Sequence, residues 1–367
     1  MAANGQIADL PQLIIEHGGV DMRKVRLGRS GLMVSQVGFG GIPIQRLSEE
    51  DSIAVIRRCI DLGVTFFDTA HGYTTSEERI GRAIAGRRDG LVLATKSGAR
   101  DAETFREEMA LSLQRLGVEH IDLMQFHGVS DEQGYQQILA PGGAMEAARE
   151  AQAAGHIGHL GVSSHSMDLA KELVKSGHFE TLMFPFNFMT DQPARELIPL
   201  CREHDVGFIA MKPMGGGLLE NATVAFKYLR QFADVVPIPG IEKIEEMAEI
   251  VSVVEGPREL AEQELAEIEE RRKELGPRFC RRCGYCQPCE QGIRIPMVLS
   301  ILSFVKRMSP ERAFSGRMAE GVARFEDCID CGECEARCPY NLPIREMMRD
   351  IVTRYKEQLA LYEAAQA

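Results

Sequence analysis

The sequence lacks the features that would tie the chain to a membrane or to a secretory route. Its longest notable apolar run, Pro296 to Val305, falls well short of the roughly 20 residues that a transmembrane helix needs. The opening residues, MAANGQIADLPQLIIEHGG, have neither the basic start nor the long apolar stretch of a secretory signal. Tryptophan is also absent, which excludes nothing by itself. We therefore expect a cytoplasmic protein without a membrane span.

An excess of positive charge is missing as well. The chain has 42 basic and 54 acidic residues, a net charge of -12 and a pI of about 5.4. This balance excludes a general attraction to nucleic acid phosphates, and we expect no nucleic acid partner. Apolar residues make up 44% and charged residues 26% of the chain, as in ordinary globular proteins. The composition therefore excludes a disordered, collagen-like or coiled-coil protein.

Cysteine is scarce in most of the chain and dense at its end. Cys59 and Cys201 stand alone in the first 279 residues, and the other eight cysteines lie between Cys280 and Cys338. In a large cytosolic chain, clustered cysteines two residues apart indicate metal binding and not disulfides. The chain thus divides into a cysteine-poor body and a cysteine-rich tail.

The body alternates between short apolar runs and helical patterns. Residues 23–40 predict a hairpin around Gly28–Gly31. From Val37 onward, eight apolar runs each precede a helical segment; the predicted strands are 37–40, 64–68, 91–96, 121–126, 159–163, 181–186, 207–211 and 235–239. Such a pattern predicts an α/β fold, a (β/α)8 TIM barrel. The alternative is a doubly wound open sheet, which lacks support because no strand is followed by GxGxxG.

Polar residues stand at the ends of successive predicted strands, where a barrel of this kind carries its function. Asp68 ends the second strand, and Tyr73 follows in the loop HGYTT. Lys96 ends the third strand, and His127 follows the fourth. Each residue alone is explained by a turn, a helix cap or a satisfied core position. The set of four is harder to dismiss.

These four side chains suit one kind of chemistry. A tyrosine, whose pKa is about 10 in water, becomes a general acid near neutral pH when a lysine ammonium lowers that pKa or assists the proton transfer. A carboxylate can keep the lysine charged and oriented. An imidazole opposite can hydrogen-bond a substrate carbonyl and fix its position.

The segments DTAHGYTTSEERIGRAI, LATKSG and DLMQFHG together resemble the aldo/keto reductases, over roughly residues 23–255. The resemblance implies NAD(P)H-dependent reduction of a small-molecule carbonyl, or oxidation of an alcohol. It implies that Tyr73 is the proton donor and that Lys96 modulates it. Asp68 would be the partner of Lys96, and His127 would orient the substrate.

The same resemblance implies a set of cofactor contacts. Ser163 and Ser164 stand where the family has a Ser–Asn pair, and Met183 stands where it has a glutamine. Met211 takes the place of a tyrosine that stacks on the nicotinamide, and Met stacks less well. Asn187, after the sixth strand, is a further candidate contact. NADP, NAD, a flavin or an emptied site all remain open.

Two further segments are candidates for holding phosphate. Lys212 with Gly215, Gly216 and Gly217 can cradle a pyrophosphate through backbone N–H groups, although glycine loops are commonly just turns. Lys243 stands where the family often has a basic residue for the NADP 2′-phosphate. It lies among Glu242, Glu245 and Glu246, which disfavour a phosphate unless they point away.

The tail carries two runs of four cysteines. The first is Cys280, Cys283, Cys286 and Cys289, and the second is Cys328, Cys331, Cys334 and Cys338 followed by Pro339. The second run has the bacterial ferredoxin spacing CxxCxxCxxxCP, in which the fourth cysteine ligates the other cluster. We therefore predict two [4Fe–4S] clusters with crossed ligation: Cys280, Cys283, Cys286 and Cys338 for one, and Cys328, Cys331, Cys334 and Cys289 for the other. The alternative is a pair of structural zinc sites.

The segments CGYCQPCEQGIRIP and CIDCGECEARCPYNLPI, with helix-like stretches between them, resemble α-helical ferredoxin domains. The whole chain resembles the iron–sulfur-containing branch of the aldo/keto reductases, which supplies no substrate. The predicted organisation is an N-terminal extension (1–22), an aldo/keto reductase-like barrel (23–256), a linker helix (257–278), a ferredoxin-like domain with two clusters (279–345) and a C-terminal helix (346–367).

Basic residues gather in the tail despite the acidic balance of the chain. Between Gly276 and Met318 there are eight arginines or lysines and two acids. These cations can favour reduction of a nearby cluster or dock an acidic electron-carrier protein. The alternative is charge pairing with the Glu-rich predicted helix 259–275.

Three functions follow for the whole chain, because nicotinamide transfers two electrons as hydride and a cluster transfers one. In the first, the barrel performs hydride chemistry and the clusters are structural or regulatory. In the second, a flavin or a partner connects clusters and barrel in one redox path. In the third, the chain is an electron-transfer subunit with a silent barrel, against which the intact set of four residues argues.

Overall fold

The computed structural model describes residues 22–366, so the predicted N-terminal extension lies outside the described residues except for Met22. Eight parallel strands run side by side in chain order; they are β3 (Phe39–Gly40), β4 (Phe66–Asp68), β5 (Val92–Ser97), β6 (Ile121–Phe126), β7 (Ile157–Ser163), β8 (Thr181–Pro185), β9 (Gly207–Met211) and β10 (Val235–Ile238). The first and last strands meet, since Gly38 N–H donates to Pro237 O at 2.9 Å and Gly40 N–H to Pro239 O at 2.7 Å. The predicted TIM barrel is confirmed, and the open sheet is wrong.

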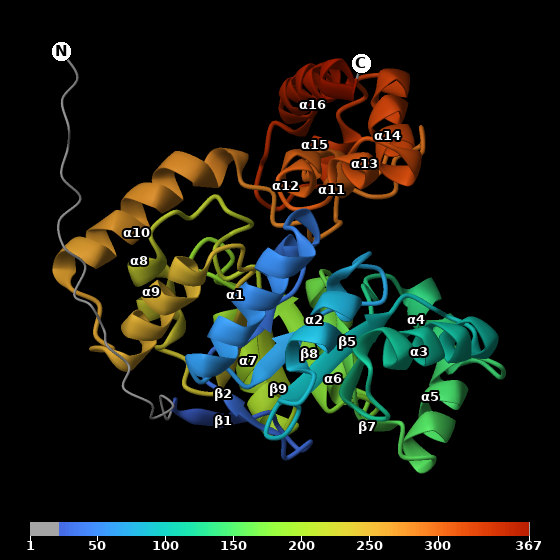
Figure 1. Cartoon of the computed structure of the whole chain (residues 1–367). Helices are drawn as coiled ribbons and strands as arrows, with labels where there is room; N and C mark the ends of the chain where they lie inside the picture. The colour runs from blue at the N-terminus through green and yellow to red at the C-terminus, as the bar shows by residue number, and fades with distance from the viewer. Residues whose placement is uncertain (1–21, 367) are drawn as a thin grey trace.

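Helices surround the barrel (Figure 1); they are α1 (Glu49–Asp61), α2 (Ser76–Ile84), α3 (Ala102–Leu116), α4 (Glu132–Leu139), α5 (Ala144–Ala153), α6 (Met167–Lys175), α7 (Pro193–Glu203), α8 (Ala222–Leu229) and α9 (Ile244–Glu255). Capping residues determine where several of these helices begin and end. Ser48 caps α1 by accepting a hydrogen bond from Asp51 N–H at 3.0 Å, and Gly117 ends α3 in the left-handed region at φ 65°. The sequence analysis did not predict α4 or the short helix η1 (Pro43–Arg46).

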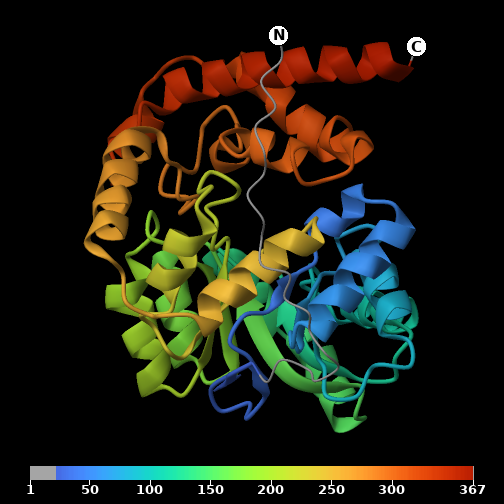
Figure 2. The ribbon, with the colours of Figure 1, turned by 60° about the vertical axis from the view of Figure 1, so that its left-hand side comes forward.

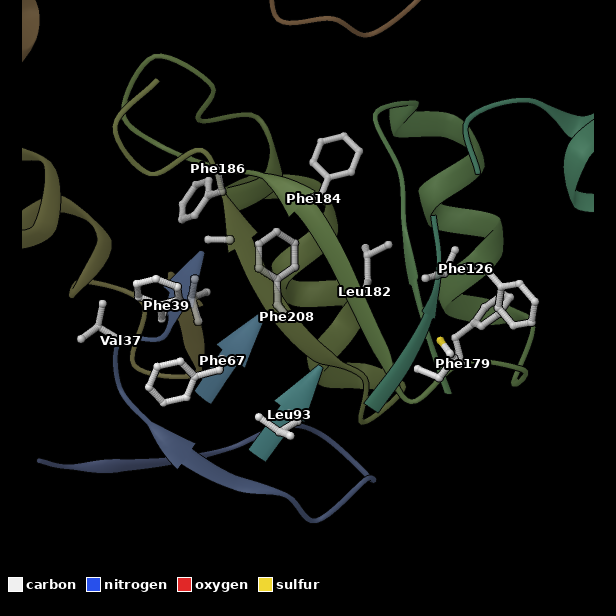
Figure 3. Close-up of a cluster of buried hydrophobic side chains, with 14 of the residues drawn as sticks. Val37, Phe39, Phe67, Leu93, Phe126, Phe179, Leu182, Phe184, Phe186 and Phe208 are labelled. Carbon is white, nitrogen blue, oxygen red and sulfur yellow. The ribbon is translucent and has the colours of Figure 1, made fainter. Parts of the chain in front are cut away.

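The main core lies between the strands and this ring of helices. Figure 3 shows phenylalanines from neighbouring strands, including Phe39, Phe67 and Phe208, packed together in this layer. Phe39 is fully buried and its ring centroid lies 5.4 Å from that of Phe67. The strands therefore bury side chains on their outer face as well as inside the barrel, which explains why the sequence shows continuous apolar runs.

A hairpin closes the N-terminal end of the barrel. Its strands β1 (Lys24–Arg26) and β2 (Met33–Ser35) pair antiparallel, as predicted. Leu27 and Val34 are fully buried and share a cluster with Phe66 and other residues of the barrel interior. With this end filled by apolar side chains, the opposite end is the one that can admit a substrate.

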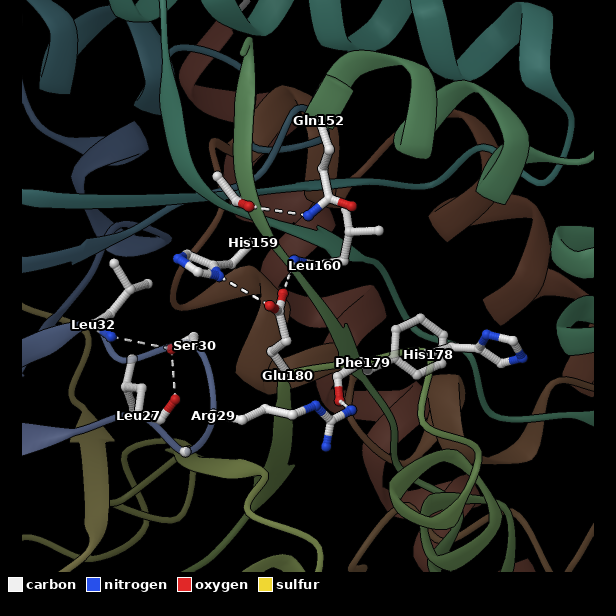
Figure 4. Close-up of polar contacts among 12 residues, drawn as sticks. Leu27, Arg29, Ser30, Leu32, Gln152, His159, Leu160, His178, Phe179 and Glu180 are labelled. Atoms are coloured by element: carbon white, nitrogen blue, oxygen red, sulfur yellow. Dashed lines mark hydrogen bonds and ion pairs between the residues drawn. The ribbon is translucent and has the colours of Figure 1, made fainter. Parts of the chain in front are cut away.

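Polar contacts fix the hairpin to the neighbouring strands, as Figure 4 shows. Arg29 Nη2 donates to Phe179 O at 2.5 Å, and Ser30 Oγ donates to Leu27 O at 2.5 Å. Glu180, directly before β8, accepts from Leu160 N–H in the middle of β7 at 2.7 Å. These bonds satisfy backbone groups at a loop-rich end of the barrel, so they serve the fold.

The tail folds into helices that lie over the other end of the barrel (Figures 1 and 2); they are α11 (Ile295–Val298), α12 (Ile301–Val305), α13 (Pro310–Ala313), α14 (Gly316–Ala323), η3 (Arg324–Asp327), α15 (Glu333–Ala336) and α16 (Ile344–Gln366). We call residues 279–366 the cluster domain. It has its own core, in which Cys286, Cys334 and Cys338 are buried with aliphatic side chains. The helix-like stretches between the two cysteine runs are each broken into shorter helices. Within residues 22–366, no helix is long and apolar enough to cross a membrane.

The helix α10 (Glu262–Leu275), with the short helix η2 (Gly276–Arg278), connects the barrel to the cluster domain. It makes polar contacts with the barrel. Lys227 on α8 pairs with Glu264 at 2.6 Å, and Arg272 Nε donates to Phe188 O at 2.9 Å. The helix is therefore held against the barrel, and it delivers the chain to the barrel's C-terminal end.

Candidate active site and cluster-binding cysteines

A buried ion pair lies at the C-terminal end of the barrel. Asp68, the last residue of β4, accepts a hydrogen bond from Lys96 Nζ on β5 at 2.5 Å. The two side chains are 4% and 2% exposed. Lys96 Nζ also donates to Thr69 O at 2.6 Å. Burial alone would lower the pKa of Lys96, but Asp68 and Tyr73 outweigh it and raise that pKa, so the lysine is held as an ammonium.

Gln125 on β6 completes this pair, and the sequence analysis missed it. Its Nε2 donates to Asp68 Oδ2 at 2.9 Å, and the residue is fully buried. Both carboxylate oxygens of Asp68 thus have a partner, as a buried charge requires. The available signal was a polar residue inside the otherwise apolar run LMQF.

Tyr73 lies directly against the lysine. The turn after β4 places it there, with Tyr73 N–H bonded to Ala70 O at 2.8 Å. Lys96 Nζ lies 5.1 Å from the centroid of the Tyr73 ring. Burial raises the pKa of Tyr73, while Lys96 acts in the opposite direction. Of the two effects expected of the lysine, a lowered pKa or an assisted proton transfer, the first is not found, because the net direction of the pKa is upward. The phenol therefore stays protonated at neutral pH and available as a proton donor.

His127 faces Tyr73 from the end of β6. The two ring centroids are 5.7 Å apart and the planes meet at 82°. Burial, together with the charges of Lys96, Arg100 and Arg312, lowers the pKa of His127 to about 3. The imidazole is therefore neutral at physiological pH, and it can hydrogen-bond a carbonyl without adding a charge. The structure thus brings together all four residues that the sequence singled out.

Two arginines of the cluster domain also reach this site, and the sequence analysis did not place them there. Arg312 Nη1 donates to the carbonyl of Gly72, the residue before Tyr73. Arg282, in the first cysteine run, lines a cavity with the barrel residue His165. The sequence could not show this, because nothing in it fixes how the tail sits on the barrel.

Some of the candidate cofactor contacts line a cavity between the barrel and the cluster domain. This cavity has a volume of about 310 Å³, at the lower end of the range for small-molecule sites. Its lining includes Asn187, Lys212, Gly215, Gly216 and Gly217 from the barrel, and Cys280, Arg281, Arg282 and Lys306 from the cluster domain. The site is therefore built by both domains.

The other candidates line neither this cavity nor the one around Arg282. Ser163 Oγ accepts from Gly128 N–H at 2.8 Å, and Ser164 Oγ accepts from Ser166 N–H at 3.2 Å. Met211 packs in part against the apolar barrel interior. Lys243 is exposed beside the first residue of α9. A nicotinamide role for these four stays a prediction.

Lys212 is a partly buried amine in the interdomain cavity without a carboxylate partner among the described residues. Its Nζ lies 2.8 Å from His165 Nε2, and no described carboxylate lies within ion-pair distance of it. Burial, Arg282 and Arg307 hold the pKa of Lys212 well below its usual value. An anionic group in this cavity would relieve that repulsion, so the residues present fit a phosphate-bearing cofactor.

The glycine loop uses two of its three glycine N–H groups for its own turn. Gly215 and Gly217 have φ values of 57° and 88°, which favour glycine. Their N–H groups are used within the loop, by Lys212 O at 2.9 Å and Met214 O at 2.8 Å. Ser303 on α12 donates to Gly216 O at 3.3 Å. The loop therefore serves first as a docking point for the cluster domain, and side-chain cations carry the positive charge of the cavity.

The eight tail cysteines form two groups. Four line a cavity of about 170 Å³ that also has apolar walls; they are Cys289, Cys328, Cys331 and Cys334. In the other group, burial raises the pKa of Cys280, and the nearby thiols of Cys283 and Cys338 raise it further. Cys289 thus lies with the second run and Cys338 near the first, a grouping that supports the predicted crossed ligation. Each group offers the four thiolates that a [4Fe–4S] cluster takes.

The two groups differ in distance from the barrel. The cavity of the Cys289 group is lined by cluster-domain residues alone, among the residues described. Cys280 and Cys283, in contrast, line cavities that they share with barrel residues such as Lys212 and His165. The Cys280 group is therefore the inner one. Cys59 and Cys201 are buried in the barrel core, where burial raises the pKa of each thiol.

Comparison with known proteins now adds to this geometry. Residues 36–226 match the model of the aldo/keto reductase family, and residues 279–343 match that of a 4Fe-4S dicluster domain. The chain belongs to the aldo/keto reductase family. It is an oxidoreductase of this type with a C-terminal 4Fe–4S domain, as the sequence predicted, and the match decides against the zinc alternative.

The relatives of this aldo/keto reductase match its barrel. The uncharacterized oxidoreductase YqkF of Bacillus subtilis is 32% identical over 212 residues, which cover 54% of this chain and 67% of YqkF. The aldo-keto reductase yakc [NADP(+)] of Schizosaccharomyces pombe is 30% identical over 209 residues, or 52% of this chain and 61% of that protein. The chain thus spans about two thirds or less of the length of these relatives.

One solved structure is matched over almost its whole length by this aldo/keto reductase. The holo form of aldo-keto reductase AKR11C1 from Bacillus halodurans has a TM-score of 0.60 at 26% identity, covering 68% of this chain and 96% of its own. Nearly all of the solved chain is matched, but about a third of this chain is not. This difference is consistent with a cluster domain added to a complete barrel.

Proposed function

We propose that this aldo/keto reductase reduces the carbonyl group of a small molecule, or oxidises the alcohol, with NAD(P)H and with Tyr73 as general acid and base. One observation carries the proposal: a protonated tyrosine stands over a buried lysine–carboxylate pair, with a neutral imidazole at 82° to its ring. This arrangement joins a proton donor, a fixed positive charge and a hydrogen-bonding group at one point.

The residues divide the work of carbonyl reduction. NAD(P)H, when bound, supplies the hydride to the carbonyl carbon. Tyr73 gives its phenolic proton to the oxygen as negative charge develops there. Lys96 stabilises the phenolate that remains, and Asp68 keeps Lys96 charged and in place. His127 hydrogen-bonds the substrate oxygen and orients it, and the cluster domain above helps to exclude water.

The interdomain cavity supports a nicotinamide cofactor. Lys212 and the arginines around it offer charge for phosphates, and Asn187 lines the same cavity. The name of the fission yeast relative carries NADP(+), which we extend to this chain as part of the proposal. NADP is the version we favour.

We further propose that the cluster domain holds two [4Fe–4S] clusters, the inner on the Cys280 group and the outer on the Cys289 group. The two sets of four thiols support this number. Each cluster exchanges one electron at a time. In the favoured function the clusters support the structure that covers the active site.

A second candidate function connects the clusters to the barrel in one redox path. The observation in its favour is that Cys280 lines the same cavity as Lys212 and the glycine loop. A flavin in that cavity would bridge one-electron and two-electron chemistry, and an acidic carrier protein would exchange electrons with the outer cluster. In this version the chain can also act as an electron-transfer subunit.

Anaerobic mixing separates the two candidates. The purified protein is mixed with NADPH, then with an aldehyde, while the absorbance of nicotinamide and of the clusters is recorded. The favoured function predicts nicotinamide oxidation only after the aldehyde is added, with the cluster absorbance unchanged. Cluster bleaching by NADPH alone would instead support the redox path. No response to either addition would contradict carbonyl reduction.

A further inference from the structure

The cluster domain holds a group of arginines over the mouth of the barrel that form no ion pair with any described carboxylate. A cavity of about 830 Å³ lies there, and four arginines line it: Arg282, Arg294, Arg312 and Arg317. The acid that lines it is Asp131. None of these four arginines forms an ion pair with a described carboxylate. Pairing with the Glu-rich helix α10, the alternative raised by the sequence, does not occur for them.

Arg312 stands closest to the proposed chemistry. One of its guanidinium nitrogens donates to Gly72 O, which fixes the group beside Tyr73. Its second terminal nitrogen, Nη2, lies 4.0 Å from where a Cβ on Gly72 would be. The side chain is only partly exposed and lines the cavity. A guanidinium has five N–H donors in a planar fork, so most of them remain for a ligand.

Arg282 lines the same cavity from the first cysteine run. Its guanidinium carbon lies 4.8 Å from the centroid of the Phe304 ring, which leaves the in-plane donors free. Its backbone N–H donates to Cys280 Sγ at 3.4 Å. Its positive charge can therefore act on a cluster held by Cys280 as well as on a ligand in the cavity. Arg312 contacts the turn that holds Tyr73. A substitution of Arg312 therefore tests ligand binding separately from an effect on a cluster.

The cavity around Arg312 also differs from the proposed phosphate site of the cofactor. Arg282 lines both cavities, but Arg312 lines only the one of about 830 Å³, and Lys212 lines only the other. A cation that served cofactor phosphates would belong to the Lys212 cavity. Arg312 is thus placed for a group on the substrate.

We propose that Arg312, with Arg282, makes this active site selective for carbonyl compounds that carry an oxyanion, a carboxylate or a phosphate. The inference rests on the proposed function, because it places the carbonyl of the same molecule at Tyr73. Guanidinium groups bind carboxylate and phosphate through paired, charge-assisted hydrogen bonds. Two partly buried cations without a carboxylate partner among residues 22–366 are best satisfied by an anion from outside.

Binding without turnover tests the inference. Three para-substituted aldehydes share one ring and differ in charge: 4-formylbenzoate, 4-formylphenyl phosphate and the neutral 4-formylbenzamide. Calorimetric titration of the holoprotein is done without reduced nicotinamide. We expect at least one anion to bind more tightly than the amide by about 10-fold or more, and Arg312→Gln to weaken that anion by about 10- to 100-fold while leaving the amide unchanged. The benzoate and phosphate arms identify the oxyanion.

A control variant at another arginine and a second substitution at Arg312 complete the test. Arg324→Gln removes an exposed arginine of the same domain that lines neither cavity, and it should change no affinity. Iron content and thermal midpoint show whether Arg312→Gln folds. If it does not, Arg312→Lys keeps the charge but loses the fork, and the anion alone should weaken.

Two results would overturn the inference: equal affinity of wild type for the amide and both anions, or an equal effect of Arg312→Gln on all three probes. Its failure differs from failure of the proposed function. Wild-type protein that binds an anion selectively but reduces no aldehyde with NADPH contradicts the proposed function alone. Reduction of all three aldehydes with similar kcat/KM contradicts the inference alone.

Discussion

The Asp68–Lys96 pair shows why single residues matter at this site. Both charges are buried, and each depends on the other for its partner. Taking two charges out of water is expensive, so such a pair adds little stability over an apolar pair. What it supplies here is a fixed ammonium beneath Tyr73.

Removing one partner should therefore cost more than removing both. Asp68→Asn leaves the ammonium buried without its counter-charge, and we expect it to lower the free energy of unfolding by about 3 kcal/mol. The double variant Asp68→Asn with Lys96→Met should recover part of this loss. Urea unfolding of the three proteins, followed by circular dichroism, measures the effect. A double variant less stable than Asp68→Asn would show that the pair does not act in this way.

The pH dependence of stability should report on His127. Its pKa falls from an ordinary 6.5 to about 3 in the folded chain. Between these values the unfolded chain binds the extra proton, so the free energy of unfolding rises with pH across this window and is lost as the pH falls through it. Wild type should lose more stability than His127→Gln between pH 7.5 and pH 5. Parallel stability curves would mean that His127 is not buried in the neutral form.

At the scale of elements, the apolar runs predicted the barrel well, because parallel strands and amphipathic helices leave strong patterns. The strand Ile121–Phe126 begins and ends as predicted. The short helix α4 was missed because its eight residues, EQGYQQIL, include a glycine and few apolar positions. In the cluster domain, the helix-like stretches between the cysteine runs are broken into shorter helices, and no break was predicted from the sequence.

The candidate site, like the fold, was predictable from the sequence only in part. Strand ends pointed to Asp68, Lys96 and His127 because parallel strands bring their carboxyl ends to one place. Gln125 was hidden inside a strand, and Arg312 lies far along the chain on another domain. Its role follows only from how that domain docks, which no local pattern records.

Crossed ligation joins the two cysteine loops into one element, and iron content can test it. Cys289→Ser and Cys331→Ser should each leave about four irons of eight and should remove the same spectroscopic signal, because both cysteines would serve the outer cluster. Cys280→Ser should remove the other signal. Cys59→Ser, a buried barrel thiol, is the control that should keep all the iron. Loss of different signals in Cys289→Ser and Cys331→Ser would contradict the crossed pattern.

At the scale of the whole molecule, the cluster domain is placed as a cover for the barrel. The N-terminal end is filled by the hairpin, and the cluster domain lies over the C-terminal end (Figure 2). Arg282 from the first cysteine loop and Arg312 from α13 line the cavity there. Contacts such as Tyr285 Oη to Asp168 at 2.6 Å and Tyr340 Oη to Gln192 at 3.0 Å hold the two domains together. A barrel that keeps its four polar groups under such a cover is built for chemistry on an enclosed substrate.

The most direct test of this account is the loss of the Tyr73 hydroxyl. Tyr73→Phe keeps the ring against Lys96 and His127 but removes the proton donor. We predict that kcat/KM for aldehyde reduction with NADPH falls by about 10²- to 10⁴-fold, while iron content and thermal midpoint stay at wild-type values. Aldehyde reduction by Tyr73→Phe at the wild-type rate would contradict the account.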